Sequence, residues 1–150
     1  MALDATLAYL HFAAILAVAG FLVAEAMLLR GDLGRRDVAV LARTDFAYFL
    51  AAMVALATGL ARVFFGAKGV DFYTGNPAFW IKVVLFVAVA AVSIKPTFRF
   101  AGWRRAARDA SGYSVPDAEV RGARRLVVVQ LHLLAVLPLA AVLMARGIGH

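Results

Sequence analysis

The sequence predicts an all-α integral membrane protein, a single-domain four-helix bundle with both termini outside. Three observations support this: 64% of the 150 residues are hydrophobic, the mean hydropathy is +0.85, and the apolar residues gather in four long runs. Soluble domains are only about half apolar and about one quarter charged, whereas 17% of this chain is charged. A water-soluble core of this size could not cover so much apolar surface, so the expected partner is the lipid bilayer.

The four apolar runs cover residues 5–29, 46–65, 77–94 and 126–145. Each has about the 17–25 residues that cross a bilayer as an α-helix. The first run follows no basic segment and is too long for the apolar part of a signal peptide. We therefore expect it to remain in the mature protein as the first transmembrane helix.

Local signals mark the ends of the later helices. Asn76 precedes Pro77, and a capping residue before a proline at the first helical position predicts the start of the third helix. Proline lacks the amide hydrogen that a helix needs. Pro96 therefore predicts an end or a bend of the third helix, and Pro138 predicts a bend in the fourth.

The distribution of charge predicts the orientation. The net charge is +7, and twelve of the sixteen Lys and Arg residues fall between the first and second runs or between the third and fourth. Cytoplasmic connections collect Lys and Arg, so both termini are expected outside. Because the few charges flank membrane spans, no nucleic-acid partner is expected. The twelve residues are Arg30, Arg35, Arg36, Arg43, Lys95, Arg99, Arg104, Arg105, Arg108, Arg121, Arg124 and Arg125.

Aromatic residues accompany both kinds of connection. The long basic connection is expected to lie on the anionic cytoplasmic leaflet, with binding of a partner as the alternative. The connection between the second and third runs is expected to form an outer aromatic belt. The aromatic residues of the first group are Phe98, Phe100, Trp103 and Tyr113, and those of the second are Phe72, Tyr73, Phe79 and Trp80.

The chain contains no cysteine. This excludes disulfides, thiolate metal sites, iron–sulfur ligation and covalent c-type haem attachment. The four methionines are too far apart in sequence to form an evident thioether site for copper. What remains open is the non-covalent binding of a cofactor.

Three basic residues lie inside the spans in one outer layer. His11, Lys82 and Arg62 are roughly 9, 8 and 5 Å below the outer ends of their spans. A neutral imidazole ligates iron, and Lys and Arg bind carboxylates such as haem propionates. His11 is therefore a candidate metal ligand, with Lys82 as a second ligand or propionate partner and Arg62 as an anion clamp. In the alternative, both cations reach back to the interface and His11 bonds a neighbouring backbone group or Tyr9.

A second, mixed-charge layer lies near the inner ends of the spans and contains Glu25, Asp45, Tyr48 and His132. Glu25 is expected to pair with Arg43 or His132 and to hold the bundle in register, with a proton relay as the alternative. The heights of His11 and His132 differ by roughly 12 Å in a core of about 30 Å. One haem therefore cannot easily use both histidines.

Several segments carry a resemblance to known families. They are Tyr9-Leu10-His11, residues 58–63 (Thr-Gly-Leu-Ala-Arg-Val), Phe79-Trp80-Ile81-Lys82 and residues 93–97 (Ser-Ile-Lys-Pro-Thr). Over nearly its whole length the chain resembles a family of small bacterial four-helix membrane proteins of unknown function. More distantly, it resembles the grouping of copper-resistance D-like proteins and HemJ-type protoporphyrinogen IX oxidases.

The distant resemblance implies a cofactor. The HemJ type associates b-type haem with a histidine early in the first span and a lysine early in the span before the large cytoplasmic connection. His11 and Lys82 match those positions. Arg62 and Glu25 within the spans depart from that type, so its oxidase activity is not carried over.

These observations lead to two functional hypotheses. The first is a b-type haem protein of the bacterial inner membrane that acts in electron transfer or oxidises a porphyrin-like or quinol-like substrate. Such a protein would have an electron-transfer partner or form a homo-oligomer. The second is a non-catalytic membrane protein without haem, either an accessory subunit or a small transporter-like bundle.

Overall fold

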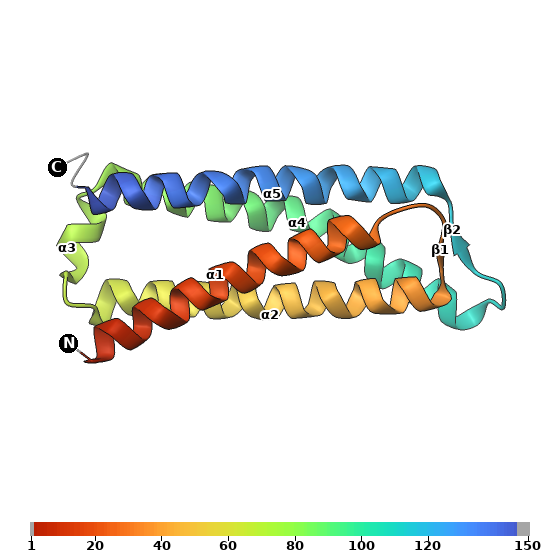
Figure 1. Ribbon diagram of the computed structural model, residues 1–150, viewed down its shortest axis with the longest axis horizontal. Helices are drawn as coiled ribbons and strands as arrows, with labels where there is room; N and C mark the ends of the chain where they lie inside the picture. The colour runs from red at the N-terminus through yellow and green to blue at the C-terminus, as the bar shows by residue number, and fades with distance from the viewer. Residues whose placement is uncertain (1, 147–150) are drawn as a thin grey trace.

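The computed structural model describes residues 2–146, apart from the side chains of Ala140 and residues 143–145. Four helices are long and apolar enough to cross a membrane, which confirms the all-α class and the four predicted spans. A short fifth helix and a two-stranded ribbon connect them (Figure 1). The order is α1 (Ala2–Leu28), β1 (Leu33–Gly34), α2 (Arg35–Phe65), α3 (Gly69–Thr74), α4 (Pro77–Asp109), β2 (Ser114–Val115) and α5 (Asp117–Ala145).

The four long helices pack side by side. α1 lies against α2 and α5, and α4 also lies against α2 and α5, so α1 and α4 are diagonal to each other. The start of α1, the end of α5 and the short helix α3 share one end of the bundle, called here the terminal end (Figure 1). The antiparallel β1–β2 pair, with Leu33 opposite Val115, lies at the other end, called the ribbon end.

Two of the helices are longer than a membrane is thick. α2 has 31 residues and α4 has 33, which is about 46 and 50 Å at 1.5 Å per residue, against a hydrocarbon core of about 30 Å. The predicted runs 46–65 and 77–94 are the apolar parts of these helices. The basic segments beside them are further helical turns that continue past the membrane at the ribbon end.

The proline signals had different outcomes. Asn76 caps α4 as predicted, because its side chain accepts a hydrogen bond from the Ala78 amide at 2.8 Å with Pro77 in the first turn. The prediction that Pro96 could end this helix is wrong, since α4 continues to Asp109. Pro96 is buried inside the bundle, where neighbouring helices can compensate for the missing bond. Pro138 also lies inside a helix, α5.

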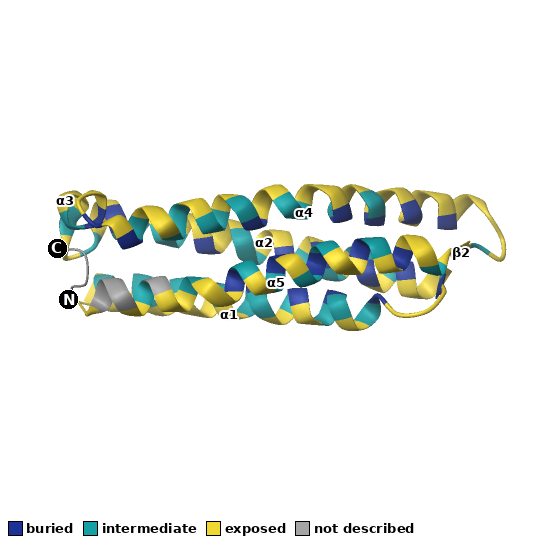
Figure 2. Ribbon diagram, turned by 90° about the horizontal axis from the view of Figure 1, so that it is seen from above, coloured by how far each residue is buried: buried dark blue, intermediate teal, exposed yellow. Residues whose placement is uncertain are grey.

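The main core lies toward the ribbon end. Buried positions of α4 follow the side that faces the bundle (Figure 2). Phe100 and Trp103 are buried there, and the Trp103 indole donates to the Glu119 carboxylate at 3.0 Å. The expectation that these aromatic residues lie on the leaflet is therefore wrong, while Phe98 is exposed. Burial, and then the nearby Glu119 carboxylate, raise the pKa of the Tyr113 phenol.

Candidate functional site

His11 lies between α1 and α2. Its Nδ1 atom is 3.0 Å from the carbonyl oxygen of Ala55 and 3.2 Å from the Thr58 hydroxyl. Gly59 makes room for this approach, because a Cβ at that position would lie 3.0 Å from the His11 Cε1 atom, a tight contact that the ring could relieve only by shifting. The histidine therefore contacts the neighbouring helix α2, not the diagonal helix α4.

These hydrogen bonds fix the tautomer of the imidazole. A carbonyl oxygen can only accept, so Nδ1 carries the proton, and the lone pair of the neutral ring is on Nε2. The Thr58 hydroxyl donates to the Val54 carbonyl at 2.6 Å and is therefore free to accept from His11. The sequence also predicts, as an alternative to haem, that His11 bonds a neighbouring backbone group, and this hydrogen bond is present with Ala55. Because the bond uses Nδ1, Nε2 is available to a ligand.

Arg62 follows Thr58 by one helical turn on the same helix. Its Nε atom is buried and has no hydrogen-bond partner among the described residues. A buried donor without a partner is rare in proteins and costs free energy. Lys82, on α4, is half-buried.

The structure brings the three predicted residues together in electrostatic range. The charges of Arg62 and Lys82 both act on His11, and the charge of Arg62 also acts on Lys82. The group thus has one residue from each of α1, α2 and α4, and α2 packs against both of the other helices. The ion pair that the structure describes joins Arg121 to Asp117, near the start of α5 and outside this group.

An aromatic cluster closes the terminal end of the bundle beside this group. The rings of Phe72, Tyr73, Phe79 and Trp80 follow one another with centroids 5.4 to 5.8 Å apart. Tyr73 is buried, and the indole of Trp80 donates to the Thr74 carbonyl at 3.0 Å. The predicted outer belt is thus in part a packed cover, since only Trp80 is largely exposed.

The inner layer differs from its prediction. Glu25 is 1% exposed and its Oε1 atom has no hydrogen-bond partner among the described residues. Its electrostatic neighbour is Asp45, so the predicted pair with Arg43 or His132 is wrong. His132 is exposed and bonds the Val128 carbonyl of its own helix at 2.7 Å. Heights along the helices placed these residues in one layer but could not say which way each faces.

The neighbours of Glu25 form a buried polar cluster. Asp45 accepts a hydrogen bond from Thr97 at 2.9 Å, and the Tyr48 hydroxyl donates to Gln130 at 3.3 Å. All four long helices therefore place a polar side chain at this level. Gln130 and Thr97 were missed in the sequence, because an uncharged polar residue at the edge of a span gives no distinct signal.

Two grooves follow the α2–α4 contact at the ribbon end. The larger has a volume of about 430 Å³ and the smaller about 240 Å³, and the two share Arg104 and Arg108. Neither groove is lined by His11, Arg62 or Lys82. Sequence reasoning did not find them, although the recurrence of Thr97, Phe100, Arg104 and Arg108 at helical spacing marks one stripe along α4.

Comparison with known proteins gives a family and no activity. The family model described as "Predicted membrane protein (DUF2214)" matches residues 3–149, nearly the whole chain. No curated protein and no solved structure matches this chain. With its matching length and its four membrane-length helices, the chain belongs to the DUF2214 family of predicted membrane proteins.

Proposed function

We propose that this protein binds b-type haem in the terminal half of the bundle and acts in electron transfer or in oxidation of a porphyrin-like or quinol-like substrate. The observation that carries the proposal is the gathering of His11, Arg62 and Lys82 from three helices into one basic group. A buried guanidinium inside a membrane is costly without an anion, and the buried Nε atom of Arg62 has no hydrogen-bond partner among the described residues. The two carboxylates and the iron of a haem match this set of donors.

The histidine has the form that an iron ligand needs. With Nδ1 donating to the Ala55 carbonyl, the ring is held in place and Nε2 presents its lone pair. Metal-ligating histidines usually donate their other ring nitrogen to such a carbonyl or carboxylate. His11 would therefore bind the haem iron.

Arg62 and Lys82 are suited to bind the two propionate groups of haem. The unpartnered Nε of Arg62 would gain a charge-assisted hydrogen bond from a propionate. Lys82 would hold the second propionate or supply a second ligand. When bound, haem would supply one-electron redox chemistry. The protein would orient the His11 imidazole and neutralise the propionates with Arg62 and Lys82. The aromatic cluster near α3 would limit the access of water.

The resemblance to the HemJ type supports the same two residues, His11 and Lys82. His11 and Lys82 do not line either groove of the ribbon end, so those grooves are not part of the proposed haem site. By the distribution of basic residues, the terminal end faces outward from the bacterial inner membrane. A reporter fused after His150 should then be active outside the cytoplasm, and activity only in the cytoplasm would contradict this orientation.

The visible spectrum of the purified protein tests the proposal. Membranes from haem-replete cells should yield a protein with haem bands in the reduced-minus-oxidised difference spectrum. His11→Ala should reduce haem per protein at least about tenfold, because it removes the imidazole that would bind the iron. Lys82→Ala should have a smaller effect, since Arg62 can still hold a propionate.

His132→Ala is the matched control, because this histidine is exposed and bonds only within its own helix. It should keep the wild-type haem content. Equal haem in wild type and His11→Ala, or loss only in His132→Ala, would contradict the site.

We propose as a second candidate that the protein is non-catalytic and binds no haem. It would act as an accessory subunit or as a small transporter-like bundle. The observation that favours it is that His11 already has partners within the bundle, Ala55 and Thr58. A colourless preparation with full stability would support this function over haem binding.

A further inference from the structure

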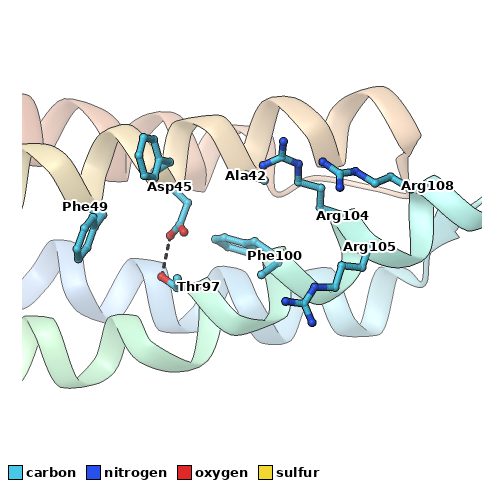
Figure 3. A pocket seen from close by; sticks show the side chains of 10 residues that line it. Ala42, Asp45, Phe49, Thr97, Phe100, Arg104, Arg105 and Arg108 are labelled. Atoms are coloured by element: carbon cyan, nitrogen blue, oxygen red, sulfur yellow. Dashed lines mark hydrogen bonds between the residues drawn. The ribbon is translucent and has the colours of Figure 1, made fainter.

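The larger groove at the ribbon end has walls of two different chemical kinds. α2 lines it with Phe46 and Phe49, and α4 lines it with Arg104, Arg105 and Arg108 (Figure 3). Figure 3 shows the three arginines gathered toward one end of the groove and Phe49 at the other. The groove therefore changes along its length from basic to apolar.

Within the part of the chain that the structure describes, the groove arginines have no anionic partner. The smaller groove continues the same contact and adds Arg35 and Arg43 to Arg104 and Arg108. Among residues 2–146, no hydrogen bond or ion pair involves the guanidinium group of any of these five arginines. The carboxylate on the wall, Asp45, is already held by the Thr97 hydroxyl at 2.9 Å (Figure 3). The groove thus has an excess of positive charge.

The depth of the arginines matches lipid phosphates. The apolar run of α2 begins at Phe46, and Arg43 lies roughly 5 Å before it along the helix, at headgroup level. Arg104 and Arg108 line the same groove as Arg43, so they reach this level from α4. On α2, Phe46 and Phe49 are 61% and 53% exposed, so the apolar part of the groove is open toward the acyl chains.

We propose that this groove is a binding site for an anionic phospholipid of the leaflet at the ribbon end. The phosphate lies against Arg104, Arg105 and Arg108, and an acyl chain covers Phe46 and Phe49. A free anion would satisfy the arginines but leave the apolar wall uncovered. A zwitterionic lipid would bring no net negative charge to the five guanidinium groups. Basic pockets between transmembrane helices are typical sites for anionic headgroups.

This site does not depend on the haem proposal, because the two share no residue. It is tested by native mass spectrometry of the detergent-purified full chain, titrated with phosphatidylglycerol, phosphatidylcholine or inorganic phosphate. We expect retained adducts and a raised melting temperature with phosphatidylglycerol. Phosphatidylcholine and inorganic phosphate should give neither effect.

Two variants separate a groove from diffuse attraction. The triple variant R104Q/R105Q/R108Q should weaken phosphatidylglycerol binding by about fivefold for each guanidinium removed. Its matched control is R30Q/R36Q/R125Q, which removes three exposed arginines from the same end but outside both grooves. Ala101→Trp keeps every charge and fills the groove, and it should also displace the lipid.

Each contrary result overturns the site. Equal losses in the two triple variants would mean attraction to a basic surface, not a groove. Unchanged binding in Ala101→Trp would mean that the acyl chain does not occupy the groove. Protection by inorganic phosphate equal to that by phosphatidylglycerol would mean a site for free anions. If the first triple variant does not fold, Ala101→Trp and the comparison of lipids still decide the matter.

Discussion

The two ends of the bundle are built differently. Fifteen buried hydrophobic residues form the core that reaches the ribbon end, whereas the described cluster at the terminal end contains three. The ribbon end therefore holds most of the buried apolar contacts that stabilise the fold. The terminal end has half-buried basic groups, and two buried donor atoms there, Arg62 Nε and Asn76 Nδ2, have no hydrogen-bond partner among the described residues. The comparison shows that the end with less apolar packing is also the end where basic side chains lie within the apolar spans.

The largest expected effect comes from the ribbon-end core. Phe100→Ala should lower the free energy of unfolding by about 3–5 kcal/mol, because Phe100 is 0% exposed and its removal leaves a cavity. Thermal unfolding in detergent measures this. Phe79→Ala, at the half-buried edge of the terminal cluster, should cost markedly less. Equal losses would contradict the difference in packing between the two ends.

Glu25→Gln should raise stability, by about 1–3 kcal/mol, because a buried carboxylate without a cationic partner is replaced by a neutral amide. We expect stability to rise because the Glu25 Oε1 atom has no hydrogen-bond partner among the described residues and because its charged neighbour, Asp45, is also acidic. Haem content should not change, since Glu25 is far along α1 from His11. A loss of stability would show that Glu25 has a cationic partner after all, and full stability with loss of a proton-coupled activity would support a relay.

Gly59→Ala should act on the terminal site more than on the fold. The new Cβ would lie 3.0 Å from the His11 ring, so the imidazole must shift, at a cost of about 1 kcal/mol in stability. We expect a clear loss of haem per protein. Gly20→Ala is the control, because nothing lies within 4 Å of a Cβ there and alanine favours a helix. Wild-type haem content in Gly59→Ala would contradict the role of this close contact.

The sequence by itself determined the features that depend on position along one helix. Hydropathy placed four spans, and Asn76 with Pro77 placed the start of α4. These succeeded because a bilayer imposes a fixed thickness, which converts residue number into depth. Pro96 was misjudged because its cost depends on the helices around it, not on α4 alone.

Only the tertiary structure decided which side chains meet within a layer. In a membrane both the lipid-facing and the packed sides of a helix are apolar, so the sequence carries little of the periodicity that separates them in soluble proteins. For this reason depth could not tell that His11 faces Ala55, or that Glu25 faces Asp45 instead of Arg43. The α2–α4 grooves likewise exist only through the packing of two distant segments, which sets the rotation of each helix about its axis.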